Sequence, residues 1–103
     1  MRGLLKGASE ILPVYKPDIT KAVDRFLKKL PPKQFRQVVQ TILKLRFDSN
    51  PHDSKQLIGS PAYKRVDIGE FRIIYHVEDD VAKIALVGKR NDNDVYRKFE
   101  KLL

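Results

Sequence analysis

The spacing of apolar residues changes once along the chain. Between Pro17 and Arg46, apolar residues recur every three or four positions, which is typical of helices that bury one face. From Tyr63 onward, apolar and polar residues alternate, which is typical of strands with one buried face. The pattern predicts an α+β domain in which helices precede a small antiparallel sheet.

The first half of the chain is predicted to hold two helices. The first begins at Pro17–Asp18 and is ended by Pro31–Pro32, and the second runs from about Lys33 to Arg46. Because the break between them is short, we expect the two helices to lie antiparallel as a helical hairpin on one face of the sheet. The residues expected to be buried are Ile19, Ala22, Val23, Phe26, Leu30, Phe35, Val38, Val39, Ile42 and either Leu43 or Leu45.

Three segments outside these helices have weaker patterns. Met1 to Glu10 shows little periodicity and is expected to be a loose arm of a single domain, residues 1–103. Ile11–Tyr15 is predicted as a short edge strand, the position in a sheet that tolerates Pro13. The polar run from Asp48 to Ser54 is predicted to be a loop.

The second half of the chain is predicted to form a three-stranded meander and a final helix. Tight turns at Gly69–Glu70 and Glu78–Asp80 make each pair of strands antiparallel neighbours. A short helix from Val95 to Leu103 follows, with Asp94 as its expected cap. The predicted strands run from Tyr63 to Ile68, from Phe71 to Val77 and from Val81 to Gly88.

Composition narrows the class of protein. A chain of 103 residues and 12.0 kDa, with 42% hydrophobic residues, has room for one core. It has no cysteine and no apolar run long enough to span a membrane, so we expect a cytoplasmic protein without a disulfide framework. The net charge of +8 and the pI near 9.8 favour a polyanionic partner, above all nucleic acid.

Most common catalytic motifs are absent from the sequence. It holds no phosphate-binding glycine loop, no nucleophile elbow and no metal-binding pair of histidines. His52 lies in a polar loop and is expected to be solvated, whereas His76 is expected to be an ordinary strand residue. We therefore expect neither a metal nor another cofactor.

The remaining candidate for chemistry is a group of cations on the predicted sheet. Arg72 is expected to share a face with Arg65 and Asp67, which lie one hairpin away. Arg90 follows the third strand, and Tyr96 opens the last helix. Guanidinium groups beside a tyrosine suit RNA, because arginine binds phosphate bidentately and aromatic rings stack on bases. The alternative is that the arginines are solvated and Tyr96 is a core residue.

Three segments resemble the RelE/ParE superfamily of bacterial toxins. Leu57–Gly59 and Tyr63–Tyr75 resemble the signature that the superfamily shares. Gly88–Arg90, followed by Val95–Tyr96, resembles the RelE branch specifically, since gyrase-inhibiting ParE members generally lack this segment. The resemblance covers roughly residues 11–103, by motif in the second half and by pattern in the first, and it implies a RelE-like fold.

The resemblance also implies an activity and roles for site residues. RelE-like toxins cleave messenger RNA in the ribosomal A site, by attack of a 2′-hydroxyl on its own phosphate without a metal. By resemblance, Arg72 and Arg90 would stabilise the scissile phosphate. Tyr96 would orient the nucleotide or take part in proton transfer.

One position departs from the family pattern. Arg65 matches the first of two lysines that the family carries on the preceding strand, but Asp67 stands where the second lysine is usual. Lys64 would replace that lysine only if the strand slipped by one residue. Asp67 is expected to be ionised, either as an ion pair for the arginines, which we favour, or as the base for the 2′-hydroxyl. Lys64 and Lys89 are expected to help bind RNA.

By resemblance, the partners would be the ribosome, messenger RNA and an acidic antitoxin. Two other functions stay open at this point. One is a ParE-like toxin that inhibits DNA gyrase by binding to it. The other is a superfamily member without toxicity that acts as a binding subunit.

Overall fold

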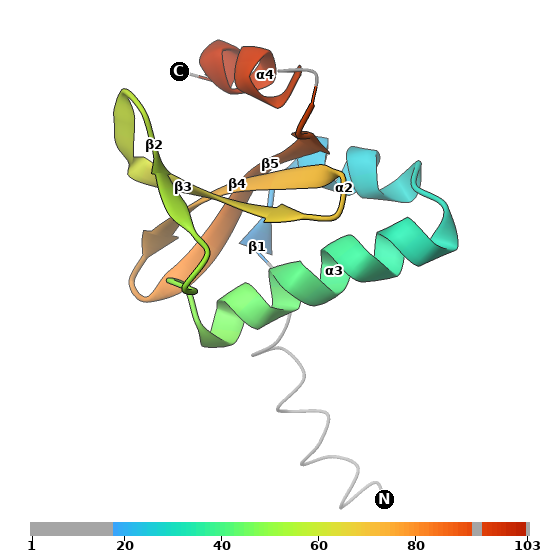
Figure 1. Cartoon of the computed structure of the whole chain (residues 1–103), viewed down its shortest axis with the longest axis horizontal. Helices are drawn as coiled ribbons and strands as arrows, with labels where there is room; N and C mark the ends of the chain where they lie inside the picture. The colour runs from blue at the N-terminus through green and yellow to red at the C-terminus, as the bar shows by residue number, and fades with distance from the viewer. Residues whose placement is uncertain (1–17, 92–93, 103) are drawn as a thin grey trace, which may run out of the picture.

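A twisted five-stranded sheet forms the centre of the computed structural model, which describes residues 18–91 and 94–102 (Figure 1). The strand order is β1-β5-β4-β3-β2. Within the described residues, no helix is long and apolar enough to cross a membrane. The elements in chain order are β1 (Asp18–Ile19), α2 (Lys21–Lys28), α3 (Pro32–Phe47), β2 (Lys55–Leu57), β3 (Ser60–Ile68), β4 (Phe71–Glu78), β5 (Val81–Lys89) and α4 (Asp94–Leu102).

The predicted antiparallel meander is confirmed as β3, β4 and β5. The β3–β4 turn contains Gly69 at φ 58°, a left-handed conformation that glycine adopts without a side-chain clash. The β4–β5 turn places Asp79 and Asp80 at φ 53° and 62°, as a two-residue hairpin turn requires. The main difference is that β3 begins at Ser60, earlier than the Tyr63 predicted from alternation.

The predicted start of the first helix is wrong. Asp18 and Ile19 form β1 instead, paired in parallel with β5, and the helix begins at Lys21. Thr20 explains the boundary. Its side chain accepts a hydrogen bond from the backbone N–H of Val23 (3.2 Å) and donates one to the carbonyl of Ala85 (3.0 Å). The threonine therefore caps α2 and attaches it to β5.

The face of the sheet covered by α2 and α3 holds the larger core. Ile73 and Tyr75 point into it from β4, whereas Ile74 points to the other face, as the alternation predicted. Tyr75 is fully buried, its hydroxyl donates to the carbonyl of Ser49 (3.0 Å), and burial raises its pKa. The buried residues of this core are Val23, Leu27, Val38, Ile42, Leu45, Val66, Phe71, Ile73, Tyr75, Ala82, Ile84 and Val87.

The helical core differs from the predicted one at several positions. Phe35 is 40% exposed rather than buried, because it lies in the first turn of α3, which extends past the β3–β4 turn (Figure 1). Leu27, which was not predicted, is buried on α2. Leu45 rather than Leu43 completes the buried stripe of α3. Pro32 lies within α3 as its first residue, where a missing N–H has no cost.

The opposite face of the sheet is covered by α4. This helix was predicted as Val95–Leu103; it is observed from Asp94 to Leu102. Its Val95 and Phe99 pack with Leu57, Ile74 and Leu86 in a second, smaller core. The strand β2, which was not predicted, contributes Leu57 to this core and pairs with β3.

Several predictions concern parts of the chain outside the described residues. These are the arm from Met1 to Glu10, the edge strand at Ile11–Tyr15, the capping side chain of Asp94 and the end of the last helix at Leu103.

Candidate functional site

Arg72 of β4 lies at the centre of the candidate site. Pairing of β3 with β4 across the Gly69 turn places Arg72 directly opposite Asp67. The Arg72 Nε donates to Asp67 Oδ1 (2.6 Å), and Nη2 donates to Oδ2 (2.9 Å). This is the bidentate geometry in which a guanidinium binds a carboxylate most strongly. The side chain of Arg72 is 15% exposed, so this pair is only partly open to solvent.

Tyr96 joins the same group from α4. The Arg72 Nη1 donates a hydrogen bond to the Tyr96 hydroxyl, and the guanidinium carbon lies 5.5 Å from the centre of the tyrosine ring. Tyr96 comes directly after Val95, which is buried against the sheet, so the packing of α4 fixes where the ring lies. One guanidinium thus connects β3, β4 and α4.

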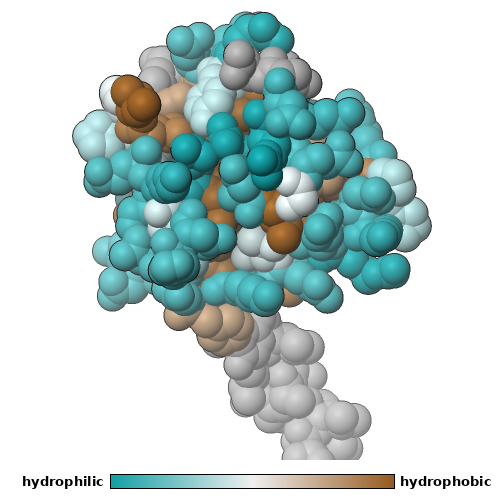
Figure 2. Space-filling model, viewed as in Figure 1, coloured by the Kyte–Doolittle hydropathy of each residue, from teal (hydrophilic) through white to brown (hydrophobic). Residues whose placement is uncertain are grey.

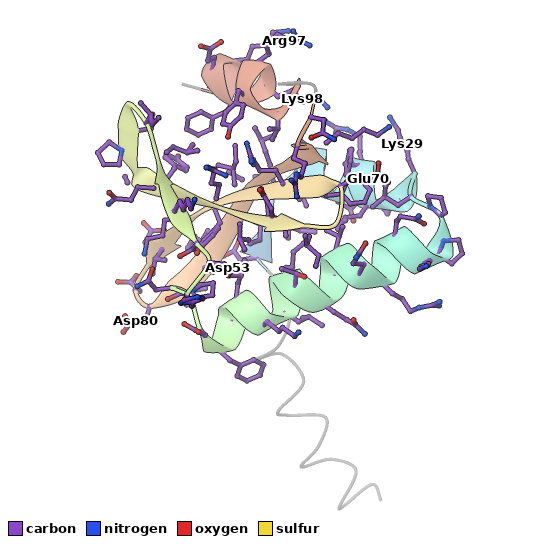
Figure 3. The ribbon with its side chains drawn as sticks, viewed as in Figure 1. Lys29, Asp53, Glu70, Asp80, Arg97 and Lys98 are labelled. Carbon is purple, nitrogen blue, oxygen red and sulfur yellow. The ribbon has the colours of Figure 1, made fainter. Side chains whose placement is uncertain are left out.

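Arg65 and Arg90 complete the positive environment of Asp67. The Arg65 Nη1 lies 3.7 Å from Asp67 Oδ2 on the same face of β3. Arg90 is exposed just after β5; its backbone N–H donates to the carbonyl of Glu70 (3.0 Å) and its Nη1 to that of Gly69 (3.2 Å). In Figure 3, Glu70 lies at this end of the sheet, whereas Asp80 and Asp53 lie at the other end.

The charges shift two pKa values in opposite directions. Hydrogen bonds from Arg72 lower the pKa of Asp67, helped by the charges of Arg72, Arg65 and Arg90 and opposed by partial burial. The hydrogen bond to Asp67 raises the pKa of Arg72, although burial opposes it. Asp67 is therefore ionised at neutral pH and is a weaker base than an ordinary aspartate.

The described residues offer little to a metal ion. Among residues 18–91 and 94–102, no three His, Asp or Glu side chains are grouped closely enough to hold one. His52 is exposed in its loop. His76 packs against Tyr63, with ring centres 5.1 Å apart.

Comparison with known proteins identifies the family of this chain. No family model matches it. The protein named as toxin RelE1 in Methanocaldococcus jannaschii is 35% identical over an alignment of 78 residues, which covers 71% of this chain and 87% of that protein. The chain belongs to the RelE toxin family. This confirms the predicted family and its RelE branch.

Solved RelE structures share the fold. RelE of the archaeal RelE–RelB complex from Pyrococcus horikoshii is 28% identical, with a TM-score of 0.65 over 77% of this chain and 98% of that one. The isolated Escherichia coli RelE toxin is 20% identical, with a TM-score of 0.63 over 86% of this chain and 99% of that one. The predicted RelE-like α+β fold is thereby confirmed.

The strand register decides where the lysines of this RelE-family chain lie. Val66 pairs with Ile73, so β3 has not slipped, and Asp67 occupies the face of Arg72. Lys64 lies opposite the core residue Tyr75, and its Nζ donates to Asn50 Oδ1 (2.8 Å). Lys89 lies opposite Phe71, a residue of the same core. The structure therefore groups Arg65, Asp67, Arg72 and Tyr96, with Arg90 at one end, while Lys64 and Lys89 lie on the other face.

A groove that the sequence did not reveal adjoins this candidate site. It has a volume of about 670 Å³ and lies between the β2–β3 hairpin and α4. Arg65 and Tyr96 line it together with the apolar residues Leu57, Ile58 and Phe99. Ile58 is fully exposed at the hairpin. An exposed apolar side chain is an exception here, because most of the surface seen in Figure 2 is hydrophilic. No pattern in the sequence predicted it, and the resemblance of Leu57–Gly59 to the superfamily signature implied only the family.

Proposed function

We propose that this RelE-family chain is the toxin of a toxin–antitoxin pair and that it cleaves messenger RNA on the ribosome, in the cytoplasm. The observation that carries the proposal is the contact of Arg72 with both Asp67 and Tyr96, beside Arg65. A preorganised guanidinium beside a tyrosine hydroxyl is suited to bind a phosphate whose negative charge increases during reaction.

The proposed reaction is an internal transfer within the RNA. The 2′-oxygen forms a bond to the adjacent phosphorus, and the bond between phosphorus and the 5′-oxygen of the next nucleotide breaks. The proton of the 2′-hydroxyl passes to water, and the leaving oxygen takes a proton from the Tyr96 hydroxyl, which water then replenishes. The products are a 2′,3′-cyclic phosphate and a 5′-hydroxyl.

Arg72 retains donors for this phosphate. A guanidinium carries one N–H on Nε and two on each Nη. The contacts with Asp67 and Tyr96 within the described part of the chain engage three of them, one each on Nε, Nη1 and Nη2. The second N–H of Nη1 and of Nη2 are left for phosphate oxygens. Arg65 and Arg90 add positive charge on either side of this position.

Asp67 has a positioning role in this proposal rather than that of the base. Its lowered pKa makes it a poor proton acceptor, while its two hydrogen bonds hold the plane of the Arg72 guanidinium. The same pairing favours a second candidate, a family member that binds its partners but cleaves slowly. Asp67 neutralises much of the charge that a phosphate would use.

The proposed protein partner is an acidic antitoxin. The RelE structure from Pyrococcus horikoshii is a complex with RelB, and a chain of net charge +8 attracts a partner of opposite charge. Long-range attraction speeds encounter and is screened by salt, so the association rate with the antitoxin should fall as ionic strength rises.

Purified toxin added to ribosomes that translate a defined message tests the proposal. We expect cuts in phase with the codons, with 2′,3′-cyclic phosphate ends, and a reduced cleavage rate in Tyr96→Phe. The control is Tyr63→Phe, since Tyr63 packs against Phe99 and lies outside the phosphate position. Intact messages together with inhibited gyrase supercoiling would refute the nuclease and support a ParE-like toxin. Intact messages with both activities absent would support the binding subunit.

A further inference from the structure

Gly88 in β5 lies beneath the start of α4. In the strand register it is directly opposite Arg72, on the face of the sheet that α4 covers. A Cβ atom built on Gly88 would lie 3.0 Å from the Cβ of Val95 and 3.5 Å from its Cα. Carbon atoms normally pack about 3.5–4.0 Å apart. A side chain at this position would therefore push Val95 away by a few tenths of an ångström.

The backbone of Gly88 does not itself require glycine. Gly59 and Gly69 have φ values of 83° and 58°, where glycine is strongly favoured. Gly88 is not among the glycines with positive φ. The absence of a side chain is therefore explained by the close approach of Val95 and not by backbone conformation.

Val95 transmits its position to the site. It is fully buried among Leu57, Ile74, Leu86 and Phe99, and a β-branched side chain in a helix has little rotamer freedom. A new methyl group on Gly88 would meet the Cβ and Cα of Val95, which no side-chain rotation moves, so the start of α4 would have to move instead. The next residue is Tyr96, whose hydroxyl accepts the hydrogen bond from Arg72.

We propose that Gly88 is a positioning residue: by letting Val95 contact the β5 backbone, it sets the distance at which Tyr96 meets Arg72. The inference deepens the proposed function, because the site it positions is the proposed nuclease site. Its structural part does not depend on that activity. A shift of about 1 Å at a reacting group can reduce a rate about 100-fold, so a shift of a few tenths of an ångström should reduce it roughly three- to tenfold.

The test compares Gly88→Ala with Val95→Ala. Gly88→Ala adds a methyl group under the helix, whereas Val95→Ala keeps its Cβ on Gly88 and only weakens packing. We expect the crystal structure of Gly88→Ala to show the start of α4 displaced from β5 by a few tenths of an ångström, with the Tyr96 hydroxyl correspondingly farther from Arg72 Nη1 than in the wild type. In solution, the nuclear Overhauser contacts between the two side chains should weaken. Val95→Ala should keep both the wild-type distance and these contacts.

Cleavage gives a second, separate measurement. If the proposed function holds, Gly88→Ala should lower kcat by roughly three- to tenfold while KM changes little, and Val95→Ala should retain most of its rate. An unchanged distance between Tyr96 and Arg72 in Gly88→Ala, or an equal increase of it in both variants, would overturn the positioning role. An increased distance in Gly88→Ala, in a protein whose wild type does not cleave RNA, would instead reject the proposed function and leave the positioning role standing.

Discussion

The two faces of the sheet have different compositions and coverings. The face under α2 and α3 is filled by apolar side chains of three strands and two helices. The face under α4 has a smaller apolar core, and beside it lie Arg65, Asp67 and Arg72, each only partly exposed. β4 contributes to both faces in alternation, with Ile73 on the first and Arg72 on the second.

Residues on the face under α2 and α3 therefore stabilise the fold, whereas the residues proposed for the chemistry lie on the face under α4. A charged group loses hydration energy when it is buried, so the cations that we propose to bind phosphate need a face that is incompletely covered. Helix α4 meets that need, because it is short and leaves the groove beside Arg65 and Tyr96 open. The other face is then left to hold the fold together. Four substitutions test whether the division holds.

Ile73→Ala should lower the free energy of unfolding by about 4 kcal/mol. Ile73 is fully buried in the larger core, and truncation of a buried isoleucine loses transfer energy and leaves a cavity. The control is the same substitution at Ile58, which is fully exposed and should change stability by less than about 0.5 kcal/mol. Urea denaturation measures both, and similar losses in the two variants would contradict the assignment of the core.

Arg72→Ala should lose about 3 kcal/mol of transition-state stabilisation, seen as a fall in kcat/KM on ribosome-bound messages. Its neighbour Ile73 holds the fold, whereas Arg72 faces the site, so Arg72→Ala should remain folded. Arg36→Ala, which removes an exposed arginine of α3, is the matched control and should cleave normally. A variant that unfolds, or one that keeps full activity, would show that Arg72 belongs to the structural face.

Phe99→Ala should loosen α4 without unfolding the rest. Phe99 packs edge-to-face on Tyr63, with ring centres 4.8 Å apart, and its loss should destabilise the docked helix by about 3 kcal/mol. Hydrogen exchange should speed up in α4 and stay slow in β4. Phe35→Ala, at the 40% exposed position of α3, should leave the exchange of α4 unchanged. Uniformly faster exchange in Phe99→Ala would mean that the two faces unfold as one unit.

Asp67→Asn should have the smallest effect, and the effect should depend on pH. The folded pKa of Asp67 lies below its ordinary value of 3.8, so its ion pair stabilises the protein above that value and is lost as pH falls through the folded pKa. Wild type should exceed the variant by about 1 kcal/mol at neutral pH. Denaturation midpoints measured down to about pH 2 should converge in acid. A gap that persists unchanged at low pH would exclude the ion pair as its cause.

The sequence was most informative where the connections are short. Alternation and the turn at Gly69 place Asp67 and Arg72 on one face, and their pairing across the hairpin follows from register alone. The contact of Tyr96 with Arg72 was different. It depends on how α4 packs on β5, and no local pattern carries that information. Tyr96 was grouped with the arginines only because the residue types suit RNA and because of the family resemblance.

Predictions failed where distant segments override local preference. Asp18–Ile19 has the pattern of a helix start, but β5 provides an edge with which these residues pair. Lys55–Leu57 follows a polar loop and is too short to show alternation, yet it pairs with β3 as β2. Phe35 fits the apolar stripe of α3, but the sheet does not extend beneath the first turn of that helix.

The attachment of α2 to β5 has a consequence for the order of folding. Thr20 and Ala85 lie 65 residues apart in the chain, whereas turns of two residues join β3, β4 and β5. Closing a longer loop costs more chain entropy, and non-local contacts form late. The meander should therefore form first, with α2 adding to it once Ala85 is in place. Thr20→Ala should accordingly speed unfolding in stopped-flow experiments and leave the refolding rate nearly unchanged, because a contact made after the rate-limiting barrier affects only the reverse step.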